Sequence, residues 1–366
     1  MKRKHDKLII FIFISFIFVM MIGNFVNADR SFSDNENRKL AQKPAFTINK
    51  LFSGKYMVEY EKYVNDQFIF RDNWINLKAY SEIMFGKIEN NNVYLGSSLV
   101  DKFTNYDQTV INNNISAINK FMKKNDDINV SALIVPTSGQ FYQNQISQFA
   151  YNLDQEKLLQ EIKSKIKGSF VDVYSDFANS EEDLYFKYDH HYNIEGAYLT
   201  YQAYLNHVGL KAVDKKDLIR EVVSDNFRGT LYSKSGLFNI KGEEIVNYYH
   251  PNLLVDVLYD QDSKATMFLK DNLKKKDQYT YFLDGNHALT QIDTHQEGKK
   301  LLLVKDSYAH ILTPLLAKHY SQIILVDPRY YKESISDLVL EKGIDEVLII
   351  YNLDNFTKDL SLGAIK

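Results

Sequence analysis

The chain has 366 residues, of which 45% are hydrophobic and 25% charged, and its formal net charge is -3 at pH 7. This length suffices for one large soluble domain, or for one domain with a satellite. The nearly balanced charge lacks the basic excess that is typical of nucleic-acid binding. The absence of cysteine excludes disulfides, cysteine nucleophiles and thiolate metal sites.

The first 28 residues have the pattern of a membrane anchor or a secretion signal. Four basic residues precede an uncharged run over residues 8–26, and such a run, at about 1.5 Å per residue in a helix, nearly crosses the hydrocarbon core of a bilayer. Basic residues before the span favour a cytoplasmic N-terminus and place the rest of the chain outside. The sequence Val26-Asn27-Ala28 also resembles a signal-peptidase site. We therefore expect an extracytoplasmic protein, anchored by this helix or secreted after cleavage behind Ala28.

Beyond this segment the chain is predicted to hold a polar stalk over residues 29–50 and a folded domain over residues 51–366. Helices are predicted over residues 54–86, 108–124, 154–166, 194–208 and 333–342, and strands over residues 93–96, 130–135, 170–174, 301–304, 323–326 and 347–350. Residues 221–290 mix short β-like runs with glycines and are predicted to be an insertion or cap. Because strands alternate with helices, the fold class is predicted as α/β, with a parallel sheet flanked by helices.

Three polar residues follow the ends of predicted strands, where parallel sheets collect ligands. Ser307 follows strand 301–304 and precedes a helix through residues 315–316, so its hydroxyl is a candidate nucleophile or an ordinary helix cap. Asn352, after strand 347–350, can donate an amide N–H to an oxyanion. Arg329, after strand 323–326, can hold an acidic sugar group or steady a loop.

Asp189, His190 and His191 lie in one loop ahead of the predicted helix 194–208, which Asn193 is expected to cap. A serine nucleophile needs a base, and the base needs a carboxylate that fixes its tautomer. The spacing of two residues lets Asp189 and His191 turn the same way, so His191 is predicted as the base rather than His190. The same three side chains could ligate zinc, but no further cluster with metal spacing accompanies them, and no metal is expected.

The loop Asp189-His190-His191-Tyr192 resembles the signature of the DHHW family of bacterial envelope proteins. Further segments fit the same family along nearly the whole chain after residue 30, namely residues 36–40, 66–68, 71–72, 135–137, 305–308 and 351–352. That family is related to the alginate O-acetylation proteins, so the resemblance implies an SGNH-hydrolase-like sheet. Carried over residue by residue, it assigns a catalytic triad to Asp189, His191 and Ser307, and an oxyanion asparagine to Asn352.

Two positions depart from the family pattern. Tyr192 stands where the relatives have tryptophan, and we expect it to keep an aromatic wall at the site. Lys305 stands where the related motif has a glycine before Asp-Ser, which changes the turn ahead of Ser307.

The resemblance implies a serine-dependent O-acetyltransferase that acts outside the membrane on an exopolysaccharide or a cell-envelope glycan. An acetyl group would pass from a membrane-bound O-acyltransferase partner to Ser307 and then to a sugar hydroxyl, with no cofactor and no nucleic acid involved. Two alternatives stay open. One is a carbohydrate O-acetylesterase with the same triad, and the other is a non-catalytic glycan-binding scaffold of an export complex.

Overall fold

The computed structural model describes residues 2–260, 262–264 and 266–365. Four positions lie outside the described residues. They are residue 1 of the predicted anchor, residues 261 and 265 of the predicted insertion and residue 366 of the predicted folded domain. The chain forms two compact units. The first holds Met1–Lys87 and Ser233–Ile240, and the second holds Ile88–Tyr232 and Lys241–Lys366.

The first unit is mostly helical. Its elements are α1 (Lys2–Val26), β1 (Phe32–Ser33) paired with β2 (Arg38–Lys39), α2 (Ile48–Phe52), α3 (Lys55–Gln67) and α4 (Arg71–Met84). Helix α1 contains, over His5–Val26, a stretch that is long and apolar enough to span a membrane. By length and composition, it agrees with the predicted anchor or signal.

The single helix predicted over residues 54–86 is wrong, because the chain breaks it into α3 and α4. Phe70 adopts a left-handed conformation with φ 56° at the break. The backbone N–H of Ile69, which an unbroken helix would use internally, donates instead to the side chain of Asn24 at 2.7 Å. This contact with α1 has no signal in the local sequence pattern.

Two of the sequence segments that resemble the family bind each other in this unit. Arg38 donates to both carboxylate oxygens of Asp66, at 2.9 and 2.5 Å, and the N–H of Ala41 donates to one of them at 2.7 Å. The hydrogen bond from Arg38, together with the weaker effect of that from Ala41, lowers the pKa of Asp66 to about 2. Arg71 forms a second ion pair with Glu36. The segment predicted as a stalk is therefore bound to α3 and α4, and the unit with the sheet begins at Ile88.

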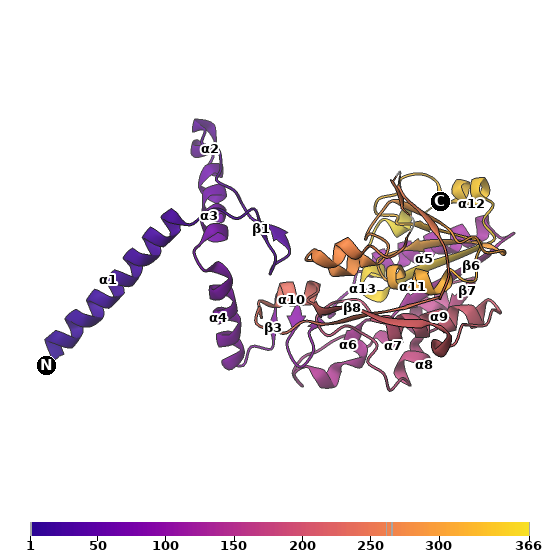
Figure 1. Cartoon of the computed structure of the whole chain (residues 1–366), viewed down its shortest axis with the longest axis horizontal. Helices are drawn as coiled ribbons and strands as arrows, with labels where there is room; N and C mark the ends of the chain where they lie inside the picture. Colours follow the sequence, from indigo (N-terminus) through magenta and orange to yellow (C-terminus); the bar gives the residue numbers. More distant parts are fainter. Residues whose placement is uncertain (1, 261, 265, 366) are drawn as a thin grey trace. The chain divides into compact units, whose positions relative to one another are not determined.

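The second unit is built on one eight-stranded sheet in the order β11-β10-β12-β14-β13-β15-β6-β7. Its parallel part comprises β14 (Gln322–Val326), β13 (Lys300–Lys305), β15 (Glu346–Asn352), β6 (Asn129–Val135) and β7 (Ser169–Val171). The antiparallel part comprises β12 (Leu289–Asp293), β10 (Asp256–Tyr259) and β11 (Asp262–Lys264). Residues of the predicted insertion thus extend the sheet past β14. Strands β6 and β7 of this sheet are labelled in Figure 1.

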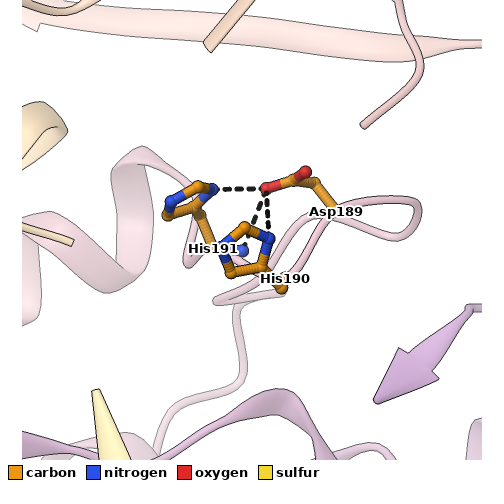
Figure 2. Close-up of side chains that lie close together, drawn as sticks. All are labelled: Asp189, His190 and His191. Carbon is orange, nitrogen blue, oxygen red and sulfur yellow. Dashed lines mark hydrogen bonds and ion pairs between the residues drawn. The ribbon is translucent and has the colours of Figure 1, made fainter. Parts of the chain in front are cut away.

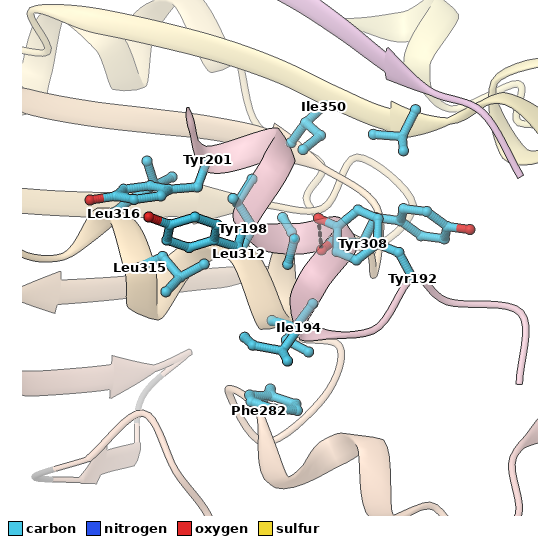
Figure 3. Packing of buried hydrophobic residues seen from close by; sticks show 14 of the residues in the cluster. Tyr192, Ile194, Tyr198, Tyr201, Phe282, Tyr308, Leu312, Leu315, Leu316 and Ile350 are labelled. Carbon is cyan, nitrogen blue, oxygen red and sulfur yellow. Dashed lines mark hydrogen bonds between the residues drawn. The ribbon is translucent and has the colours of Figure 1, made fainter. Parts of the chain in front are cut away.

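Helices cover both faces of this sheet, since its central strands are apolar on both sides. On one face, Leu301, Leu303 and Ile350 pack with α9 (Ile194–His207) and α11 (Ala309–Leu316), as Figure 3 shows for α9 and α11 side chains. On the other face, Leu302 and Val304 pack with α5 (Gln108–Lys124), α7 (Gln155–Lys165) and α12 (Ile335–Lys342). The predicted α/β class, with a parallel sheet flanked by helices, is confirmed.

Smaller elements complete the second unit. They are β3 (Glu89–Asn90), β4 (Val93–Tyr94), β5 (Val100–Asp101), α6 (Ser138–Phe141), α8 (Tyr174–Ala178), β8 (Ile219–Phe227) paired with β9 (Glu243–Tyr249), α13 (Leu353–Phe356) and five short 3₁₀ turns. Helix α10 (Thr230–Ser235) follows β8. The carboxyl ends of β13, β14 and β15 lie at one edge of the sheet. Residues 305–307, 327–329 and 352 lie at or just after these strand ends.

Candidate active site

Ser307 lies in the turn between β13 and α11, and Asp306 shapes this turn. The Asp306 carboxylate accepts the backbone N–H of Tyr308 at 2.9 Å and that of Asn352 at 2.9 Å, across the ends of two neighbouring strands. Side-chain amides of Asn352 and Asn355 add bonds of 2.6 and 3.0 Å. Asp306 is fully buried, whereas Ser307 is partly exposed. The strand end therefore presents the serine hydroxyl outward on a turn whose backbone is fixed from within.

The loop that carries Asp189, His190 and His191 is held by the start of α9. Asn193 caps that helix, because its side-chain oxygen accepts the N–H groups of Glu195 at 2.9 Å and Gly196 at 3.3 Å. The predicted cap is therefore present. Behind the loop, the N–H of Phe186 donates to the carbonyl of His191 at 3.3 Å. This closes the loop into a narrow turn with both histidines at its tip.

The structure brings Asp189, His191 and Ser307 into one hydrogen-bonded chain. The Nε2 atom of His191 lies 2.7 Å from Oγ of Ser307, 116 residues away in sequence. Its Nδ1 atom lies 2.5 Å from Oδ1 of Asp189 (Figure 2). With Nδ1–H donating to the carboxylate, Nε2 is free to accept the serine proton, which is the arrangement of a nucleophile, a base and an orienting acid.

The second oxygen of Asp189 is also satisfied. Oδ2 accepts the backbone N–H of Thr230 at 2.7 Å and its hydroxyl at 3.1 Å. Gly229 allows this approach, since a Cβ atom at that position would lie 2.2 Å from the same oxygen. The carboxylate is therefore held from two sides and cannot turn away from His191.

Burial and charge set the protonation states of the pair. Burial, with help from the neighbouring His190, lowers the pKa of His191 to about 4, although Asp189 opposes the shift. Burial alone would raise the pKa of Asp189, but the two imidazoles and the hydrogen bonds from His191 and Thr230 hold it below its usual range. At neutral pH the base is uncharged and its partner is ionised.

His190 and Tyr192, the other predicted residues of this loop, face other groups. The half-buried ring of His190 places Nδ1 2.6 Å from the hydroxyl of Thr230. Tyr192 is fully buried, and its ring meets that of Tyr308 edge to face at 4.5 Å (Figure 3). The hydroxyl of Tyr192 donates to the carbonyl of Tyr308, and the hydroxyl of Tyr308 donates to the carbonyl of His190, both at 2.7 Å. Tyr192 thus packs behind the loop rather than along an open surface.

Asn352 and Arg329 lie at the same sheet edge but are bonded elsewhere. The side-chain amide of Asn352 donates to Asp306, and its oxygen accepts the N–H of Asn355 at 2.9 Å as the cap of α13. Arg329 donates from Nε and Nη2 to the two oxygens of the buried Asp327, at 2.8 and 2.6 Å. The positive charge of Arg329 acts on His191 without a hydrogen bond and helps to lower the pKa of that imidazole.

A second polar cluster, which we call the lysine cluster, lies beside Ser307 and comprises Lys305, His310, Asp327 and Arg329. The Nζ atom of the buried Lys305 lies 2.8 Å from Nε2 of His310 and 3.4 Å from Oδ2 of Asp327. Burial lowers the pKa of Lys305 to about 8, against the attraction of Asp327. Burial and the nearby ammonium also lower the pKa of His310 well below its usual value. The lysine at the position of the family's glycine is thus part of a buried charge network.

Several groups around the loop escaped the sequence prediction. Tyr279, from the predicted insertion, stacks its ring on His191 at 3.7 Å and donates its hydroxyl to the carbonyl of Ser307 at 3.1 Å. Glu243 accepts the backbone N–H groups of Lys187 and Tyr188 at 2.9 and 2.8 Å, and burial raises its pKa to about 7. No local pattern marks either residue, because their contacts depend on segments far apart in the chain.

Among the described residues, one group of side chains could hold a metal ion. It comprises Asp189, His190 and His191, whose ligand atoms lie within 4.8 Å of one another. In the structure, however, Nδ1 of His191 and Oδ1 of Asp189 are bonded to each other, and Nδ1 of His190 is bonded to Thr230. A tetrahedral site would also need a fourth donor. The donor set therefore fits a proton relay better than a metal centre.

The comparisons with known proteins agree with this architecture. The sequence profile of the DHHW protein family matches residues 89–326. A DHHW family protein from Eubacterium siraeum has a similar solved structure, with a TM-score of 0.65 and 20% identity over 75% of this chain and 95% of that chain.

Two further solved structures also match parts of this chain. Bacillus cereus PatB1 with a sulfonyl adduct matches with a TM-score of 0.63 and 20% identity over 74% of this chain and 96% of that one. The O-acetyltransferase domain of Pseudomonas putida AlgJ matches at 0.47 and 11% identity over 75% and 95%. None of the curated proteins matches this sequence.

Proposed function

This chain belongs to the DHHW family, and from that premise we propose that it is a serine-dependent O-acetyltransferase that modifies an exopolysaccharide or cell-envelope glycan outside the membrane. The observation that carries the proposal is the position of His191, whose two ring nitrogens lie 2.7 Å from Ser307 and 2.5 Å from Asp189. A neutral base between a hydroxyl and a carboxylate is what acyl transfer through serine requires.

In the first half-reaction, Oγ of Ser307 attacks the carbonyl carbon of an acetyl ester while Nε2 of His191 takes the hydroxyl proton. Asp189 stabilises the imidazolium that forms, and the proton then passes to the departing oxygen of the donor, which leaves an acetyl group on Ser307. In the second half-reaction, His191 takes the proton of a sugar hydroxyl, whose oxygen attacks the acetyl-enzyme. The proton returns to Ser307 as the acetylated sugar leaves.

The oxyanion of each step needs hydrogen-bond donors at the same turn. Among the described residues, the backbone N–H of Ser307 donates to no protein acceptor, so we assign it to this role. The start of α11 lies immediately behind, and its dipole favours negative charge there. Asn352 serves the oxyanion in this scheme through Asp306, whose carboxylate it fixes.

The proposal places residues 1–28 as a membrane anchor or signal, residues 29–50 as a stalk bound to α3 and α4, and the catalytic domain beyond them, with residues 221–290 as an insertion. A membrane-bound O-acyltransferase is the expected acetyl donor, because the protein would work where acetyl-CoA is absent. A glycan is the acceptor.

A sulfonyl fluoride tests the nucleophile, since the Bacillus cereus PatB1 structure holds a sulfonyl adduct. We expect the purified full chain to gain one sulfonyl group on Ser307 by mass spectrometry, with loss of fluoride, and to form an acetyl-enzyme with an activated acetyl ester. Ser307→Ala should form neither and should lose at least about 10³-fold in ester turnover, whereas Ser164→Ala, at an exposed position of α7, should behave as the parent.

An assay with an oligosaccharide as acetyl acceptor distinguishes a transferase from an esterase. Acetyl gain on an oligosaccharide, in excess of acetate release, supports a transferase, and acetate release alone supports an esterase. Full acetylation of the glycan in cells that carry Ser307→Ala would refute both and leave the scaffold.

A further inference from the structure

Helix α4 presents an exposed apolar stripe along its outer side. At 100° per residue, four large hydrophobic or aromatic side chains within α4 share this side, while Ala79 on the opposite side is buried; two exposed phenylalanines flank the helix at its ends. Their exposed fractions range from 38% to 86%. The members of this α4 stripe are Phe70, Trp74, Leu77, Tyr80, Met84 and Phe85. A stripe of this size in water marks an interaction surface.

The start of α4 is fastened to the end of α1, the helix that can span a membrane. Arg30, just after α1, donates to both carboxylate oxygens of Asp72 at 3.1 Å. Asn24 of α1 accepts the N–H of Ile69 at 2.7 Å. At Gly23 the two segments approach so closely that a Cβ atom would lie 2.7 Å from Cδ1 of Ile69. The attachment involves hydrogen bonds, an ion pair and close packing, so α4 follows the position of α1.

The contact of Trp74 with Phe16 sets the level of the stripe. The two rings meet edge to face with centroids 6.5 Å apart. Phe16 lies ten residues before Val26, the last residue of α1, which is about 15 Å along a helix. Trp74 therefore lies beside the apolar part of α1 and not beyond its outer end. At this level the side of α4 that carries Trp74 faces acyl chains.

The polar residues of α4 agree with a position of this helix against the bilayer. Asp72 and Arg71 are committed to ion pairs within the unit. Lys78 and Glu82 lie one turn apart at 3.8 Å, where long side chains can reach the lipid headgroups. A helix with one apolar and one charged side can bind a bilayer with its apolar side among the acyl chains.

We propose that the α4 stripe binds the phospholipid bilayer beside α1, so that α4 forms a second contact with the membrane. This proposal rests on the proposed anchoring by α1. It commits to lipid as the occupant, because the stripe continues the lipid-facing surface of α1 through the contact of Trp74 with Phe16.

The chain carries its own probe, since Trp74 is its one tryptophan. The full chain is incorporated into phosphatidylcholine vesicles, and its fluorescence is compared in ordinary lipid and in lipid with brominated acyl chains. We expect Trp74 emission to shift to shorter wavelength in vesicles and to fall about two-fold or more in brominated lipid. Flotation of the same vesicles reports on the anchor independently.

A matched pair of variants identifies the contact surface. Leu77→Lys places a charge in the stripe and should remove at least about half of the quenching by brominated lipid. Leu340→Lys makes the same change at an exposed position of α12 in the other unit and should leave the quenching unchanged. Both positions are exposed, so both variants should fold.

The outcomes separate the two proposals. A chain that does not float with the vesicles refutes the anchor and, with it, the lipid contact. A chain that floats but whose Trp74 emission is the same in ordinary and brominated lipid refutes the lipid contact alone, and it would assign the stripe to a protein partner. Equal quenching in the Leu77→Lys variant and the parent also overturns the proposal.

Discussion

Two polar clusters lie side by side at the end of β13, and they differ in how their buried charges are bonded. In the serine cluster, made of Asp189, His191, Thr230 and Ser307, the bonds run in one line from a buried carboxylate to a partly exposed hydroxyl. In the lysine cluster, the charges of Lys305, Asp327 and Arg329 are paired with one another. The first cluster ends at a partly exposed serine, whereas every charge of the second is paired within the cluster, which we call a closed network.

The difference indicates what each cluster is suited to do. A closed network of buried charges stabilises only while every partner is present, because the loss of one leaves an uncompensated charge. A line of bonds that ends at a single hydroxyl loses little stability when the hydroxyl is removed, yet in the proposed mechanism all of the chemistry depends on that group. The lysine cluster should therefore be sensitive in stability, and the serine cluster should be sensitive in rate.

The largest expected effect is on stability, in the lysine cluster. Asp327→Asn removes the anion between two cations, one of which, Lys305, is buried, and should lower the free energy of unfolding by about 3–5 kcal/mol. Urea denaturation measures this change. Asp225→Asn, at an exposed position of β8, is the matched control and should stay within about 0.5 kcal/mol of the parent. A fall as small as the control's would show that the cluster is not a closed network.

The next effect is on rate, in the serine cluster. Gly229→Ala places a methyl group 2.2 Å from Oδ2 of Asp189, so the carboxylate must move away from His191. We expect turnover of an acetyl ester to fall about 10–100-fold, with full binding of the substrate retained. Gly363→Ala, where the added carbon meets its nearest neighbour at 3.4 Å, should leave the rate unchanged. Parent-like activity in Gly229→Ala would separate the orientation of Asp189 from catalysis.

The smallest effect is a shift in the pH dependence of the rate. In the proposed mechanism the free imidazole of His191 is the active form. Since its pKa is lowered to about 4, ester turnover should persist as the pH falls through 6.5 and should halve only near pH 4. A rate that halves near 6.5 would contradict the burial of this base. Glu243, with its pKa raised to about 7, holds the same loop, so the measurement is repeated with Glu243→Gln. A fall near pH 7 that this variant abolishes belongs to Glu243 and not to His191.

The sequence predicts the parts of this protein that local pattern determines. Apolar runs such as residues 301–304 predict the central strands, because a parallel sheet covered on both faces needs apolar side chains on both. The Asp-x-His spacing and a serine behind a strand suffice to propose three residues that the structure brings within bonding distance. Their catalytic roles stay predictions until the nucleophile is tested.

The parts that depend on distant segments could not be predicted. The helix break at Phe70 follows from a bond to Asn24, and the stack of Tyr279 on His191 follows from the path of the inserted segment. The amide of Asn352 was expected to face an oxyanion, yet the buried carboxylate of Asp306 attracts it first. In each case the partner, not the residue, decides the role, and one sequence does not identify the partner.

The two tyrosines behind the site carry a consequence for how such proteins diverge. Tyr192 and Tyr308 each donate to the other's segment, across 116 and 118 residues of chain. These two hydrogen bonds join the loop that carries His191 to the turn that carries Ser307, and they involve no residue of the chain between the two segments. Residues 221–290 can therefore vary in length and sequence away from Thr230, Glu243 and Tyr279, which contact the two turns, while the two phenolic hydroxyls help to keep the distance between His191 and Ser307.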